Sequence, residues 1–339
     1  MTGSLREQPT PRPSRLELSC GLPPSPRFAD LAALAETLGY ARVWIFDSAP
    51  FWEDPFVHLA LAAQRTTNIG LSSAVLVPAQ RPPMTVASSI AAIARLSGGR
   101  FRACFGTGFT ARRAIGQRPW TLKALGEYVE TVRALLAGDT PSLDGAAVRM
   151  LHSPGLTEPR PIDVPIWLSV FGPRGAQLAA EIADGIIGFP HPTLPTATMF
   201  SGTVLDSGED PACGRVKEAI APWRVVDWHN AYATGGQAAV DALPGGLDWR
   251  RALEAEAAPE HRHLYSFEGH VTHLPARDRL LLDHIDTKTM VADQIKTAAR
   301  LRKLANAGFR EAIYTPTGPD VERELTAMMS AQERATSLT

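Results

Sequence analysis

Two glycines flank a threonine directly after a short apolar stretch, at Gly106-Thr107-Gly108. The preceding residues, Phe101–Phe105, have the composition of a buried strand, and a helical pattern begins near Pro119. A strand that ends in small residues before a helix allows a ligand to approach the backbone closely. The run is not a complete dinucleotide-binding fingerprint, because Ala111 stands where its third glycine would be. A ligand-binding turn and a plain strand-to-helix turn are therefore both open.

A second turn of this kind, Gly172-Pro173-Arg174-Gly175, follows the apolar run Pro165–Phe171. It opens a predicted helix, whose free backbone N–H groups and positive dipole end suit a phosphate group. Arg174 adds a positive charge. We predict that Phe171 and these four residues bind a phosphate.

Side chains that can exchange protons follow two further predicted strands. Asp47 and Ser48 follow Ala41–Phe46, and His191 follows Asp184–Phe189. A carboxylate or an imidazole in such a position can act as a general acid or base. Each residue also has a structural interpretation: Asp47 as a helix cap, Ser48 as a turn residue, and His191 as part of a loop between two prolines.

The remaining histidines do not have the spacing of metal ligands. We therefore predict no metal site and interpret four of them as surface or loop residues: His261, His263, His270 and His273.

The composition excludes several classes of protein. The 339 residues include 34 basic and 35 acidic ones, which gives a net charge of −1 and no basis for nucleic-acid or membrane binding. No apolar run reaches the roughly 18 residues of a membrane-spanning helix. Three cysteines without metal-ligand spacing indicate reduced thiols and a cytoplasmic protein. The polar, proline-rich residues 1–14 are expected to form a disordered tail, and residues 331–339 a second tail.

Strands and helices are predicted to alternate about eight times between residues 15 and 330. The strands are apolar throughout, as in a parallel sheet that helices cover on its outer face. This pattern favours an α/β fold of the (β/α)8 TIM-barrel type over an open sheet. Two insertions are expected, near residues 139–164, with a hairpin at Asp144-Gly145, and at 190–286, where residues 219–228 are the candidate for the seventh strand.

In such a barrel the active site lies in the loops after the carboxyl ends of the strands. This rule brings the Gly106–Gly108 turn and the Gly172–Gly175 turn to the same end of the barrel. Together they indicate a flat, phosphorylated cofactor across the barrel mouth. Trp52 lies in the same loop as Asp47 and either flanks the ligand or belongs to the core.

Several blocks of sequence resemble the bacterial-luciferase-like superfamily of flavin- and deazaflavin-dependent oxidoreductases. They include TTNIGLSSAVLVPAQRPPMTVASSIAAIARLSGGRFRACFGTG at 66–108, PIWLSVFGPRGAQLAAEIADGIIG at 165–188 and GHVTHLPARDR at 269–279. The chain is most similar to the branch of methylenetetrahydromethanopterin-reductase-like proteins.

The resemblance implies a barrel that holds FMN or the deazaflavin F420 at the strand ends. It implies a non-proline cis peptide at Ser73-Ala74 behind the cofactor ring. It also places the Gly106-Thr107-Gly108 turn beside the cofactor and the phosphate at Phe171–Gly175. A homodimer, a small-molecule substrate and a separate flavin or F420 reductase as partner complete the expectations.

Departures from the family pattern concern the proton donors. The resemblance implies a catalytic histidine just past the second strand, where this chain has Ser48, and acidic residues where it has Cys20 and Phe109. We therefore predict an oxidoreductase that uses F420 or FMN for hydride transfer or oxygenation. The alternatives are an FMN-dependent two-component monooxygenase and a non-catalytic barrel that binds no cofactor.

Overall fold

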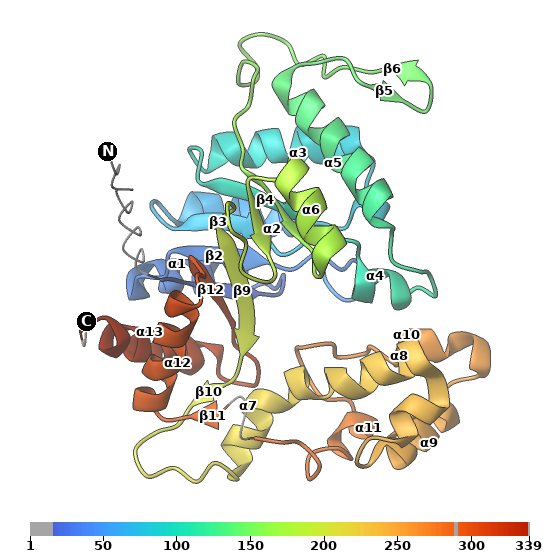
Figure 1. Ribbon diagram of the computed structural model, residues 1–339, viewed down its shortest axis with the longest axis vertical. Helices are drawn as coiled ribbons and strands as arrows, with labels where there is room; N and C mark the ends of the chain where they lie inside the picture. The colour runs from blue at the N-terminus through green and yellow to red at the C-terminus, as the bar shows by residue number, and fades with distance from the viewer. Residues whose placement is uncertain (1–15, 288–290, 338–339) are drawn as a thin grey trace, which may run out of the picture.

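The computed structural model describes residues 16–287 and 291–337. Within this part of the chain, eight parallel strands close into a barrel in sequence order (Figure 1). This arrangement confirms the predicted (β/α)8 fold. The barrel strands are β1 (Glu17–Leu22), β2 (Arg42–Ile45), β3 (Gly70–Ser73), β4 (Phe101–Phe105), β7 (Ile166–Ser169), β8 (Gly185–Ile187), β9 (Thr196–Ser201) and β12 (Glu311–Thr315).

Helices cover the outer face of the barrel. The best-patterned is α5 (Leu122–Ala137), which Thr121 caps at its start and Gly138 ends in the left-handed conformation. Its apolar side chains recur in steps of three and four and are buried. The others are α1 (Phe28–Leu38), α2 (Pro55–Arg65), α3 (Pro83–Leu96), α6 (Pro173–Ile182), α12 (Gln294–Asn306) and α13 (Val321–Ser337), with the short η1 (Pro78–Gln80) and α4 (Phe109–Arg113) after β3 and β4.

The barrel interior combines apolar packing with one buried ion pair. Trp44, Cys104 and Trp167 pack together inside it. Arg102 Nη1 lies 2.9 Å from Glu311 Oε2, and its guanidinium carbon is 4.1 Å from the centre of the Trp167 ring. Because the pair is hydrogen-bonded and stacked, the charges are compensated where water is excluded.

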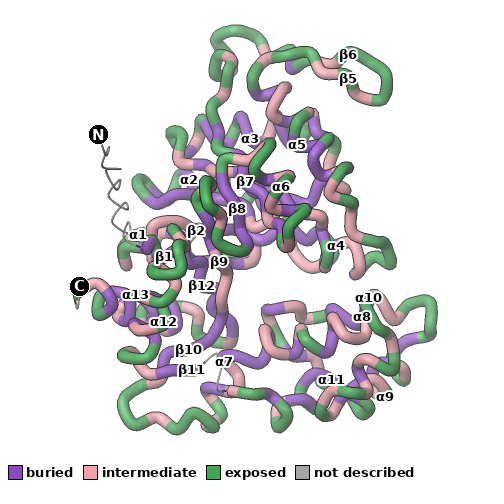
Figure 2. Tube along the Cα trace, in the orientation of Figure 1, coloured by how far each residue is buried: buried purple, intermediate pink, exposed green. Residues whose placement is uncertain are grey.

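The first insertion forms a small hairpin of β5 (Ser142–Leu143) and β6 (Ala146–Ala147). Asp144 and Gly145 form its turn with positive φ angles of 50° and 81°, as the Asp-Gly pair predicts. The hairpin projects from the barrel beyond α5, and Figure 2 shows it as mostly exposed.

The second insertion is helical and has a hydrophobic core of its own, built around Trp228, Trp249 and Leu281. We call residues 205–287 the helical insertion. It lies beside the carboxyl ends of the barrel strands (Figure 1), and a parallel pair, β10 (Thr203–Val204) and β11 (Val291–Ala292), joins it to the barrel. Its helices are α7 (Gly214–Arg224), α8 (Val226–Asp241), α9 (Gly246–Glu256), η2 (Pro259–His261), α10 (Arg262–Tyr265) and α11 (Ala276–Arg279).

Three sequence predictions differ from this structure. The seventh strand is β9, inside the predicted insertion 190–286, and residues 219–228 are helical in α7 and α8. Residues 331–337 are not a tail but the last turns of α13. The non-proline cis peptide joins Ala74 to Val75, one residue later than predicted. The predicted tail at 1–14 lies outside the described residues.

Candidate active site

A pocket of about 480 Å³ opens at the carboxyl ends of β2, β3, β4 and β7. Most of its wall is apolar, with a few hydroxyl groups and one carboxyl, which is typical of a small-molecule site. The helical insertion contributes three residues to it. The lining consists of Phe46, Asp47, Ser48, Trp52, Ala74, Val75, Val77, Gly106, Thr107, Gly108, Phe109, Thr110, Ala111, Ser169, Phe171, Met199, Trp223, His270 and Val271.

Asp47 is a buried carboxyl with one oxygen fixed and one oxygen free. Its Oδ2 accepts hydrogen bonds from Arg81 Nη1 at 2.7 Å and from the Val77 amide at 3.0 Å. Arg81 also binds Asp54, with Nη2 2.8 Å from Oδ2. Oδ1 has no partner among the described residues. Burial raises the pKa of Asp47 above its ordinary value, although Arg81 opposes the shift.

Ser48 follows Asp47 into the pocket wall and is also buried. Its backbone oxygen accepts hydrogen bonds from the amides of Phe51 and Trp52, at 2.8 and 3.0 Å. The turn therefore fixes the backbone of Ser48 and brings Trp52 to the same wall. Ser48 thus combines the predicted turn role with a place in the pocket.

The Gly106–Gly108 turn packs against the segment after β3. A Cβ atom on Gly106 would lie 2.6 Å from Val75 Cγ2, and one on Gly108 would lie 2.5 Å from Val77 Cγ1. Gly108 also has a φ of +74°. The glycines are therefore required because valine side chains occupy the space of their Cβ atoms. The sequence had instead predicted that this space admits a ligand. Val75 and Val77 themselves line the pocket.

Ser73 and Ala74, predicted beside the cofactor, have different places. Ala74 lines the pocket. Ser73 is fully buried, and its hydroxyl bonds the backbone of Cys104, donating to the oxygen at 3.1 Å and accepting from the amide at 2.9 Å. Ser73 thus joins β3 to β4 beneath the pocket.

The predicted phosphate-binding residues lie at the rim. Phe171 lines the pocket with 66% of its surface exposed, and its ring meets Phe189 edge-on. Gly172, with a φ of +77°, precedes α6, and no side chain caps this helix start. Arg174 is exposed and forms no ion pair within residues 16–287 and 291–337. Gly172, Pro173, Arg174 and Gly175 stand beside the pocket rather than in its wall.

His191 lies in the loop after β8, outside the pocket wall. Its Nδ1 accepts hydrogen bonds from the amides of Leu194 and Thr193, at 3.2 and 3.3 Å. The ring thus stabilises its own loop, and the catalytic role of His191 stays a prediction.

His270 lines the pocket, although the sequence predicted only a surface or loop residue. Its ring packs against Phe51, Trp52 and Phe267, with centroid distances of 5.6, 6.4 and 5.8 Å. Nδ1 is buried and has no partner in the part of the chain described. Burial lowers the pKa of His270 to about 3, so the imidazole is neutral near pH 7. The adjacent Val271 has a φ of +50°, which is rare for a β-branched residue.

The described residues contain neither a metal-binding cluster nor a membrane-spanning helix. No cluster of three or more histidine, cysteine, aspartate or glutamate side chains is arranged to hold a metal ion there. In the same residues, no helix is long and apolar enough to cross a membrane.

The closed barrel and a pocket at its strand ends define a class of (β/α)8 enzymes. The chain belongs to the luciferase-like monooxygenase family, because residues 7–200 match the model of that family. This finding confirms the superfamily resemblance.

Named relatives sharpen the comparison. The chain is 32% identical to 5,10-methylenetetrahydromethanopterin reductase of Methanolobus tindarius over 176 residues, 49% of this chain and 51% of the relative. It is 30% identical to F420-dependent hydroxymycolic acid dehydrogenase of Mycobacterium tuberculosis over 229 residues, 61% and 63% of the two chains. The matched part of the chain thus spans 51% and 63% of the length of these two curated relatives, less than two thirds in each case.

A solved structure shares the whole fold. An F420-dependent secondary alcohol dehydrogenase, in complex with an F420–acetone adduct, superposes with a TM-score of 0.65 over 95% of this chain and 99% of its own. At 15% sequence identity this likeness concerns the fold alone.

Proposed function

We propose that the protein is an F420-dependent oxidoreductase that transfers a hydride between the deazaflavin and a small organic substrate. The F420-dependent dehydrogenase among the curated relatives supports the choice of cofactor. The alternative is an FMN-dependent monooxygenase, and titration with both cofactors distinguishes the two.

The residues present fit such a cofactor. The pocket volume of about 480 Å³ lies in the range of cofactor sites, and Ala74 and Val75 provide an apolar surface. Thr107, Thr110 and Ser169 supply hydroxyl groups in the same wall. The uncapped start of α6, with Arg174 beside it, suits the phosphate. When bound, F420 would supply the carbon centre that accepts or releases the hydride.

The observation that carries the proposal is that two residues with an unpartnered buried polar atom line the same apolar pocket. Asp47 Oδ1 comes from the barrel and His270 Nδ1 from the helical insertion. Buried polar atoms without partners are rare in proteins, because each costs free energy until it is hydrogen-bonded. We assign them, with the Ser48 hydroxyl, to binding and orienting the polar group of the substrate.

These side chains also bear on the missing proton donor. His270 is neutral near pH 7, so one ring nitrogen donates a hydrogen bond and the other can accept one. Arg81 and the Val77 amide fix the carboxyl of Asp47 through Oδ2, and Oδ1 is left without a hydrogen-bond partner in the described residues. We propose that Asp47 replaces the histidine of the family pattern in exchanging the proton of the substrate hydroxyl or carbonyl, and that His270 orients that group by a hydrogen bond.

The proposed assembly is a homodimer, as the family resemblance implies. Val57 and Leu61 on α2 are 60% and 52% exposed one turn apart and offer an apolar contact. Size-exclusion chromatography with light scattering tests this: a monomer at all concentrations contradicts it.

Equilibrium titration of the purified protein with F420 and with FMN, followed by cofactor fluorescence, tests the proposed function. We expect saturable F420 binding that is at least about tenfold tighter than FMN binding, a difference of about 1.4 kcal/mol. The reverse preference favours the FMN-dependent monooxygenase. Binding of neither cofactor contradicts both reactions and favours a cofactor-free barrel.

A further inference from the structure

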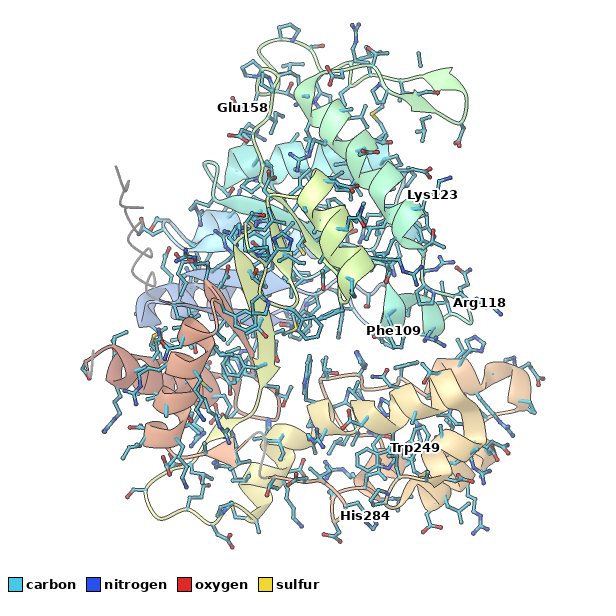
Figure 3. The ribbon with its side chains drawn as sticks, viewed as in Figure 1. Phe109, Arg118, Lys123, Glu158, Trp249 and His284 are labelled. Atoms are coloured by element: carbon cyan, nitrogen blue, oxygen red, sulfur yellow. The ribbon has the colours of Figure 1, made fainter. Side chains whose placement is uncertain are left out.

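A second pocket, of about 450 Å³, lies between the loop after β4 and the helical insertion. The end of α4 and the residues after it form one wall, and α8, η2 and α10 form the other. Figure 3 shows Phe109 and Arg118 on the side of the barrel that faces the insertion. The described lining includes Arg113, Arg118, Arg262 and His263 but no acidic residue.

The positive charges in this pocket are only partly compensated. Arg262 Nη1 lies 3.1 Å from Glu254 Oε1, so this guanidinium is paired. Arg113 Nη1 donates to the backbone oxygen of Ala233 at 2.6 Å, whereas its Nε is buried without a partner. Neither Arg113 nor Arg118 forms an ion pair with any residue that the structure describes. A buried guanidinium N–H without an acceptor is costly, and an anion would satisfy it.

The basic pocket adjoins the candidate active site through two side-chain contacts. The guanidinium carbon of Arg113 lies 4.7 Å from the centre of the Phe109 ring, and Phe109 lines the active-site pocket. Phe267, in the basic pocket, packs against His270 of the active-site pocket at 5.8 Å. The two pockets are therefore separated by little more than one layer of side chains.

We propose that the basic pocket binds the carboxylate or phosphate group of the substrate, whose reacting part occupies the active-site pocket. This inference rests on the proposed function, because it assigns the substrate class of that same site. Arg113 and Arg118 supply the uncompensated charge, and guanidinium groups match the planar, bidentate geometry of both anions. The substrate is thus a small anionic molecule with an apolar, oxidisable or reducible portion.

Isothermal titration calorimetry of the full chain with inorganic phosphate tests the anion site directly. Arg118 is exposed and forms no ion pair with the described residues, so Arg118→Gln should fold normally while weakening phosphate binding about fivefold. Lys123→Gln removes the same charge from an exposed position on α5, farther from the insertion in Figure 3, and should leave binding unchanged. Arg174→Gln identifies any phosphate that binds instead at the start of α6, the proposed site of the cofactor phosphate. Unchanged binding in Arg118→Gln, loss only in Arg174→Gln, or no binding in the unmodified protein overturns the site.

A pair of probes tests the connection between the two pockets. We expect 3-phenylpropionate to bind at least about tenfold more tightly than uncharged 3-phenylpropanol, a preference that Arg118→Gln should reduce. Equal binding of the two compounds overturns the assignment to the substrate. Neither measurement requires a cofactor, so a failure to bind F420 contradicts the proposed function without altering these results.

Discussion

The two halves of the candidate site differ in origin and in regularity. The barrel half consists of strand ends and tight turns, where Arg81 holds Asp47 and valines fill the space beside glycines. The insertion half consists of Trp223, His270 and Val271, which helices with a separate core bring to the pocket. We therefore propose that the barrel half binds the cofactor and that the insertion half selects the substrate.

We expect the largest effect in the insertion half, where the buried neutral ring of His270 makes the free energy of unfolding depend on pH. Unfolding raises the pKa of His270 from about 3 to its ordinary value of 6.5, so the unfolded chain binds the proton first as the pH falls. His270→Phe keeps a ring among Phe51, Trp52 and Phe267 and abolishes this proton uptake. Between pH 6.5 and 3 the unmodified protein should therefore lose about 1.4 kcal/mol per pH unit relative to the variant.

Urea unfolding at pH 7, 5.5 and 4.5 measures this difference. The exposed His273→Phe is the control and should follow the unmodified protein. Parallel stability profiles for His270→Phe and the unmodified protein would contradict the burial of a neutral imidazole in the pocket wall.

Gly108→Ala probes the barrel half. Gly108 and Gly39 both have positive φ angles, +74° and +90°, but a Cβ on Gly39 would meet nothing within 4 Å. Gly39→Ala should therefore cost about 1 kcal/mol for backbone conformation alone. Gly108→Ala should cost a further 1–3 kcal/mol or so for the displacement of Val77, and should weaken cofactor binding. Equal destabilisation in urea unfolding would show that the close approach is not required.

Arg174→Ala should have the smallest effect, confined to cofactor binding. Removing an exposed cation from the start of α6 should raise the Kd for F420 by about tenfold if the phosphate binds there. The free energy of unfolding should not change, because Arg174 forms no ion pair in the described residues. Lys123→Ala serves as the charge-matched control. An unchanged Kd for F420 in the fluorescence titration would contradict phosphate binding at this helix start.

The sequence predicted the barrel well because its strands are short apolar runs that alternate with amphipathic helices. It failed at β9, where the threonines of residues 196–201 weaken the apolar signal. The more apolar residues 219–228 were assigned instead, although a short apolar run fits a buried helix equally well. Here that run packs in the core of the helical insertion, with Ile220, Val225 and Trp228 buried.

The site was predictable only where it follows from strand order. Asp47, Ser48 and the Gly106–Gly108 turn could be found, because parallel strands end at the same side of a barrel. His270 and Trp223 depend on how the helical insertion packs, which no local pattern encodes. One signal was available in the sequence: Gly269 and His270 begin the block GHVTHLPARDR, which resembles the family.

The connection at the base of the helical insertion has an evolutionary consequence. The chain enters the helical insertion after β10 and returns to the barrel through β11, and these two strands pair with Thr203 in register with Val291. Buried Glu324 of α13 fixes this pair by accepting hydrogen bonds from Thr203 and Arg215, at 3.0 and 3.1 Å. A different insertion joined at the same two points would leave every barrel strand in place. We therefore propose that the helical insertion is an exchangeable unit, so that related chains could acquire a different substrate range by replacing it while the barrel and its cofactor site are inherited unchanged.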